Sequence, residues 1–126
     1  MRAIDTKVLL RLLARDDRKQ AESAEAFVAT GTWVSHLVLA EAIGVLAAVY
    51  GRDAAQLIAA LEMLLAHRSL ALQDADTVAA ALAHFKRRPA LGFSDCLVLE
   101  IARKAGHTPL GSFDKALATL PQTQRL

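Results

Sequence analysis

Short apolar segments alternate with longer helical stretches along this chain, and that alternation limits the possible fold more than any other feature. Segments of strand length fall at residues 2–5, 31–35, 69–72 and 107–113. Apolar residues at helical spacing recur between and after them. Strands that alternate with helices usually pair in parallel, with helices covering the sheet. The sequence therefore predicts an α/β fold with a small, mainly parallel central sheet. The helices are expected over residues 8–13, 21–29, 37–50, 53–65, 74–86, 96–105 and 115–120.

The composition agrees with a helix-rich core. Alanine and leucine supply 26 and 21 of the 126 residues, and aromatic residues only 5%. A chain that is 54% hydrophobic with a net charge of +2 is not intrinsically disordered. Its length fits one domain over residues 1–126, without repeats or a linker. Cys96 is the single cysteine, which excludes an internal disulfide and indicates a reducing compartment. We expect Cys96 to be a small buried residue and not a nucleophile.

The sequence shows no membrane span or signal peptide, and its charge does not identify a partner. No uncharged apolar stretch approaches the roughly 18 residues of a membrane span. An acidic residue at position 5 interrupts any signal-peptide pattern. We therefore expect a soluble cytoplasmic protein without a membrane partner. A net charge of +2 neither indicates nor excludes a nucleic-acid substrate.

Acidic residues stand where predicted strands give way to helices. Asp5 ends the first strand, Asp114 follows the last, Asp95 begins a helix after a loop, and Glu41 lies one turn into a helix. In α/β proteins ligands bind outside the carboxyl ends of the strands, so we expect the four acids to share one edge of the sheet. Helix capping is the alternative role for the three aspartates. The two roles occupy the same place and do not exclude each other.

Glu41 is the only charged residue in the apolar stretch 37–50. A buried carboxylate needs a partner, which is either a nearby arginine or lysine or a cation shared with the other acids. Clustered carboxylates favour Mg²⁺ or Mn²⁺, which prefer oxygen ligands. Two such ions can stabilise the attacking and leaving oxygens of a phosphodiester. The reaction class that this interpretation implies is phosphodiester hydrolysis.

Four segments of the chain, in this order, resemble one family of enzymes. They are residues 3–13, Glu41 in its apolar helix, Gly92 to Cys96, and Gly111 to Lys115. The chain resembles the PIN-domain ribonucleases, specifically the VapC-type toxins of type II toxin–antitoxin systems. The resemblance covers essentially the whole length, as one PIN-like nuclease domain.

The resemblance implies an Mg²⁺- or Mn²⁺-dependent endoribonuclease with a three-layer α/β/α sandwich. Metal-activated water would attack the phosphorus of an RNA phosphodiester. The four acids of the family's pocket, which hold the metal, correspond to Asp5, Glu41, Asp95 and Asp114. Two hydroxyls, those of Thr6 and Ser112, would orient ligands or water. The family's members are typically homodimers that a small antitoxin holds inactive.

One residue departs from the family pattern and keeps a second hypothesis open. The family usually has asparagine where this chain has Lys7. A cation at this position either helps to hold phosphate or competes with the metal. In the second case the chain would be a catalytically weak PIN-like module, acting mainly as a protein-binding partner in an antitoxin and repressor complex.

Overall fold

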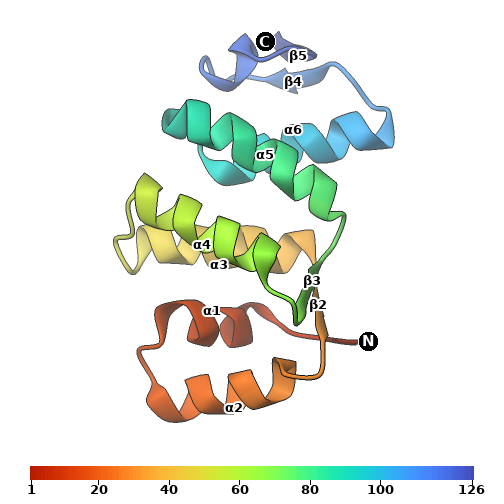
Figure 1. The fold of residues 1–126 in the computed structure, drawn as a ribbon. Helices are drawn as coiled ribbons and strands as arrows, with labels where there is room; N and C mark the ends of the chain where they lie inside the picture. Colours follow the sequence, from red (N-terminus) through yellow and green to blue (C-terminus); the bar gives the residue numbers. More distant parts are fainter. The chain divides into compact units, whose positions relative to one another are not determined.

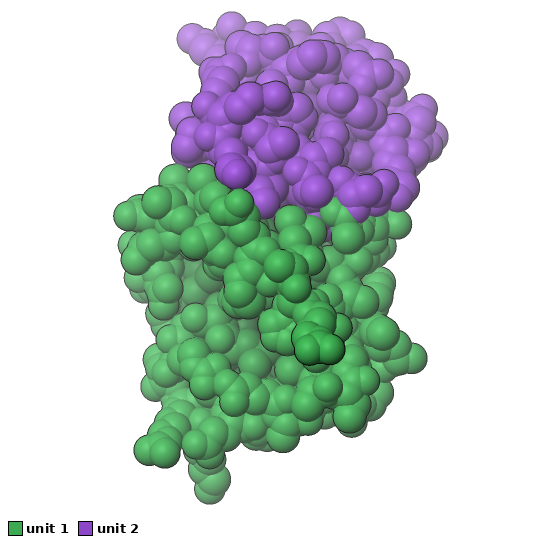
Figure 2. Space-filling view, in the orientation of Figure 1, with its two compact units in different colours: residues 1–75 green, residues 76–126 purple.

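The computed structural model describes residues 1–126 and divides them into two compact units, Met1–Ala75 and Asp76–Leu126 (Figure 2). Each unit has its own sheet and its own set of helices, and each is described separately (Figure 1). None of the helices combines the length and apolar character needed to cross a membrane.

The first unit contains three strands and four helices, with two helices between each strand and the next. Its core is aliphatic, because Leu9, Leu39, Leu46, Leu61 and Leu64 are fully buried. Helix α1 packs against both α2 and α3. The elements are β1 (Arg2–Ala3), α1 (Thr6–Ala14), α2 (Arg18–Val28), β2 (Thr32–Val34), α3 (His36–Ala48), α4 (Ala54–Ala66) and β3 (Leu70–Leu72).

The three strands of the first unit form a parallel sheet in the order β1-β2-β3. Ala3 pairs with Trp33 of β2, and Trp33 in turn pairs with Ala71 of β3. Since the strands are parallel, their carboxyl ends meet at one edge of the sheet. The residues that follow β1 and β2 therefore begin α1 and α3 from the same edge.

An aromatic pair joins the two helices of the second unit. The rings of Phe85 on α5 and Phe93 on α6 meet edge to face, with centroids 6.2 Å apart. Cys96 and Leu99 of α6 are also buried. Strands β4 and β5 pair in parallel as a separate sheet. The elements are α5 (Ala75–Arg87), the 3₁₀ turn η1 (Pro89–Leu91), α6 (Phe93–Ala105), β4 (Leu110–Ser112), the 3₁₀ turn η2 (Leu117–Thr119) and β5 (Thr123–Arg125).

The predicted α/β class with small parallel sheets is confirmed, while several details of the elements differ. The strands form two sheets and not one. Strand β5 was not expected, because Thr123–Arg125 has no apolar alternation. Helix α6 begins at Phe93 and not at residue 96, because Gly92 turns the chain at a positive φ of 76° and Phe93 is buried. The helix expected over 115–120 is reduced to η2.

Helix α3 offers a matched test of the core. Leu39 is 1% exposed, whereas Leu37, two residues earlier on the same helix, is 68% exposed. We expect Leu39→Ala to lower the free energy of unfolding by about 2–5 kcal/mol, because it leaves a cavity. Leu37→Ala should change it by no more than about 0.5 kcal/mol. Denaturant titration of both variants measures the difference, and equal losses would contradict the assignment of α3's buried face.

Candidate functional site

Asp5 connects the first strand to the first helix. Its backbone is extended, and its Oδ1 accepts a hydrogen bond of 3.1 Å from the amide of Val8, which caps α1. The residue is exposed, and Oδ2 makes no hydrogen bond within the protein. The capping role is therefore real and leaves one carboxylate oxygen available to a ligand.

Glu41 lies on α3 and is joined to the start of α1. Its Oε2 accepts a hydrogen bond of 3.0 Å from the hydroxyl of Thr6. The interpretation of Glu41 as a buried carboxylate is wrong, because the residue is exposed on the same side of α3 as Leu37. Its partner is a hydroxyl and not an arginine or lysine. Thr6 follows Asp5 directly, so this hydrogen bond holds Glu41 beside the end of β1.

Asp95 and Asp114 belong to the second unit and interact electrostatically. Asp95 lies in the first turn of α6. Partial burial raises the pKa of Asp95, and the negative charge of Asp114 raises it further. The two carboxylates are thus close enough to repel each other, although 18 residues separate them in the sequence.

Asp114 is held by two local hydrogen bonds. Its Oδ1 accepts from the amide of Leu117 at 2.9 Å, and its own amide donates to the hydroxyl of Ser112 at 3.0 Å. Ser112 ends β4, so the pattern repeats that of Asp5 at the end of β1. Here the hydroxyl of Ser112 orients the backbone of the acid.

The six predicted site residues fall into two groups. Asp5, Thr6 and Glu41 lie together in the first unit, and Asp95, Ser112 and Asp114 lie in the second. No group of three or more His, Cys, Asp or Glu side chains lies close enough together to hold a metal ion. Because there are two sheets, the acids do not follow the strands of one sheet. Their convergence on a single site stays a prediction.

The available donors nevertheless suit a hard divalent cation. All are carboxylate or hydroxyl oxygens, and Mg²⁺ and Mn²⁺ prefer such ligands. Cys96 lies next to Asp95 but is not a suitable ligand or nucleophile. Burial, with smaller effects from Asp95 and Glu100, raises the pKa of its thiol to about 11. The expected role of Cys96 as a small buried residue is confirmed.

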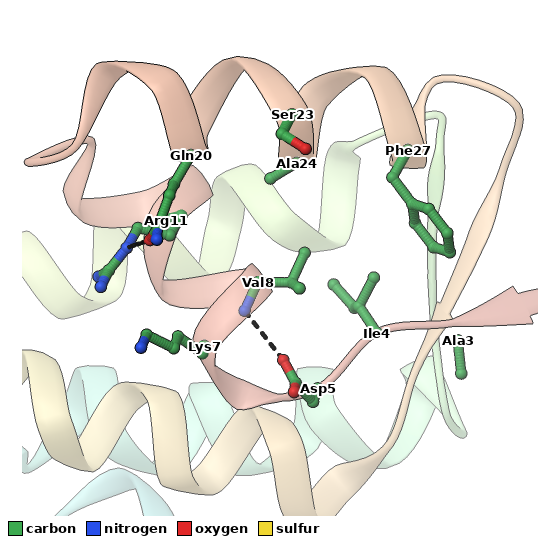
Figure 3. A pocket seen from close by; sticks show the side chains of 10 residues that line it. All are labelled: Ala3, Ile4, Asp5, Lys7, Val8, Arg11, Gln20, Ser23, Ala24 and Phe27. Carbon is green, nitrogen blue, oxygen red and sulfur yellow. Dashed lines mark hydrogen bonds between the residues drawn. The ribbon is translucent and has the colours of Figure 1, made fainter.

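A cavity beside Asp5 is the feature that the sequence did not reveal. It has a volume of about 610 Å³ and lies between α1, α2 and the end of β1 (Figure 3). Lys7 and Arg11 line it together with Asp5. Lys7 and Arg11 are four residues apart on one helix, which places both on one face. This spacing is the sequence signal that could have indicated a basic wall beside Asp5.

Within this α/β fold of small parallel sheets, Asp5 comes two residues after β1 and Asp114 two residues after β4. The family model described as PIN domain matches residues 3–122, and the chain belongs to this family. PIN domains are generally metal-dependent nucleases, so the chain has a nuclease-type architecture. No curated protein and no solved structure gives a significant match.

The repulsion between the two acids of the second unit can be tested directly. Asp114→Asn removes the negative charge that favours the protonated form of Asp95. We expect the pKa of Asp95 to fall in this variant, as measured by NMR titration of the side-chain carboxyl without divalent ions. Asp76→Asn is the control in the same unit, because Asp76 pairs with Lys104 and is not among the groups that shift Asp95. An unchanged pKa of Asp95 in the Asp114→Asn variant would contradict the electrostatic interaction between the two acids.

Proposed function

We propose that this protein is a metal-dependent endoribonuclease and the toxin of a type II toxin–antitoxin module. The observation that carries the proposal is the match of the PIN-domain family model to residues 3–122. The second unit also brings Asp114 close enough to repel the carboxylate of Asp95, in addition to the effect of burial on Asp95. A divalent cation relieves such repulsion. Membership of the PIN family supports the proposal that the cation serves a nuclease reaction.

Asp5, Glu41, Asp95 and Asp114 are the residues that would hold Mg²⁺ or Mn²⁺. When bound, the ion supplies positive charge to the phosphate and makes a water molecule more acidic. The chain's own contribution is positioning. The hydroxyl of Thr6 fixes one oxygen of Glu41, and backbone amides fix one oxygen of Asp5 and one of Asp114. Preorganised ligands of this kind lose little conformational freedom when the ion binds.

RNA is the substrate that we propose, and the charge of the chain supports it. The sequence has 15 lysines and arginines and 13 acids. Four of these acids would be neutralised by bound cations. The remaining surface is then considerably more positive than the net charge of +2, which favours a polyanion. Basic residues on this surface would make RNA binding sensitive to salt.

The first test is RNA cleavage by the purified protein with Mg²⁺ or Mn²⁺. We expect EDTA to abolish cleavage and Asp5→Asn to reduce it by more than about 100-fold, since even outer-shell partners of a metal contribute roughly 10–100-fold. Asparagine caps helices as well as aspartate does, so α1 remains intact in this variant. Asp53→Asn is the matched control, because Asp53 caps α4 in the same way and is not a candidate ligand.

Equal activities of Asp5→Asn and Asp53→Asn, or cleavage that survives EDTA, would contradict the metal mechanism. No cleavage by the wild-type chain under any of these conditions would favour the second hypothesis. The specific observation behind that hypothesis is Lys7, an exposed cation that lines the same cavity as Asp5.

The toxin role makes a separate prediction in cells. Induced expression of the wild-type chain should arrest the growth of a bacterial host, because cleaved RNA stops protein synthesis. Asp5→Asn should not arrest growth. The product of a short neighbouring reading frame should restore growth and co-purify with the chain, and light scattering should show two copies of the chain in the complex. If Asp5→Asn arrested growth as strongly as the wild type does, toxicity would not depend on this candidate metal ligand, and the prediction would be contradicted.

A further inference from the structure

The cavity between α1 and α2 has two chemically different ends. Figure 3 shows Lys7, Arg11 and Gln20 toward one end, and Ile4 and Phe27 toward the other. Asp5 lies beside both. The cavity therefore offers a cationic end, an apolar end and a candidate catalytic acid within one space of about 610 Å³.

The two cations of the polar end are not equivalent. The Nε of Arg11 donates to Oε1 of Gln20, and its Nη1 lies 3.5 Å from Oδ1 of Asp16. The hydroxyl of Tyr50, which follows the end of α3, donates to Oδ2 of the same aspartate at 2.8 Å. Arg11 is thus held in place and partly neutralised. Its main effect is to shape the cavity wall.

Lys7 has no acidic partner within ion-pair distance and is exposed. Its ammonium group is therefore the cation of the cavity that has no ion-pair partner, and the Asp5 carboxylate is the acid of the same cavity. A lysine ammonium binds phosphate well as a point charge. At the other end, Phe27 is 37% exposed, and the guanidinium of Arg2 covers one face of its ring at 3.8 Å from the centroid. The part of Phe27 that lines the cavity is an apolar surface against which a flat base can pack.

We propose that this cavity binds one nucleotide of the RNA substrate next to the bond that is cut, with Lys7 on its phosphate and its base against the apolar wall. This inference rests on the proposed function, because it takes Asp5 to mark the reacting phosphate. A nucleotide matches the cavity because it carries a negative charge and a flat base whose face packs on apolar side chains. An acidic peptide also carries charge, but only a polynucleotide must place a neighbouring unit beside the scissile bond.

The test measures binding of a fluorescent single-stranded RNA by anisotropy in EDTA, where no cleavage occurs. Lys7→Gln should weaken binding about fivefold at ~0.1 M salt and reduce the slope of log Kd against log salt by about 0.7, the loss of one phosphate contact. Lys19→Gln removes the same charge from α2 outside the cavity, and both its affinity and its slope should change less.

A second pair of variants tests occupancy without a change of charge. Ser23 is an exposed residue that lines the cavity, whereas Ala26 is exposed on the same helix and does not. Ser23→Trp should obstruct the cavity and weaken RNA binding, and Ala26→Trp should not. Because both positions are exposed, neither substitution disturbs the core, and circular dichroism verifies this.

The outcomes separate this inference from the proposed function. Loss of affinity in Lys7→Gln and Ser23→Trp, but not in their controls, supports the nucleotide subsite. If all four variants bind and cleave RNA as the wild type does, the subsite is overturned while the nuclease stands. If Ser23→Trp prevents only the binding of a partner protein, the cavity is a protein site and the inference is overturned. A wild-type chain that neither binds nor cleaves RNA overturns both.

Discussion

A side-chain hydrogen bond to the first turn of the following helical segment holds an acid at the end of a strand in each unit. Asp5 makes it to the amide of Val8, and Asp114 makes it to the amide of Leu117. The bond satisfies an amide that would otherwise lack a partner, and contributes about 1 kcal/mol. It also fixes one carboxylate oxygen and leaves the second available. Initiation of the helical segment and placement of an available carboxylate oxygen therefore depend on the same residue, so this hydrogen bond does not exclude the metal-binding role that we propose.

The sequence predicted the elements of the fold better than their pairing. Alternating periods of hydrophobicity located four of the five strands and each of the longer helices within a few residues. They could not show that β4 pairs with β5 in a sheet of its own, because pairing depends on backbone hydrogen bonds between segments. Strand β5 is invisible to such patterns, since Thr123–Arg125 is polar and is recognisable only by its partner.

The candidate site shows a similar division. Asp5 and Asp114 could be located at strand ends because turn and cap chemistry is local. The exposure of Glu41 could not be predicted. Helix α3 is apolar on nearly every face, so its sequence does not show which face packs against the core. Leu37 and Glu41 share the uncovered side. The hydrogen bond between Thr6 and Glu41 joins residues 35 positions apart and depends on the packing of α1 against α3.

The electrostatics of the second unit link the site to stability. The folded state raises the pKa of Asp95 above its ordinary value, so this carboxyl binds its proton more tightly when folded than when unfolded. Its contribution to stability is therefore most favourable at low pH and is lost as the pH rises through the raised pKa. Where Asp95 is ionised, the negative charge of Asp114 repels it, and this repulsion opposes folding. A divalent cation bound between the two carboxylates would attract both and offset their repulsion, so ligands that serve chemistry would also stabilise the unit that carries them.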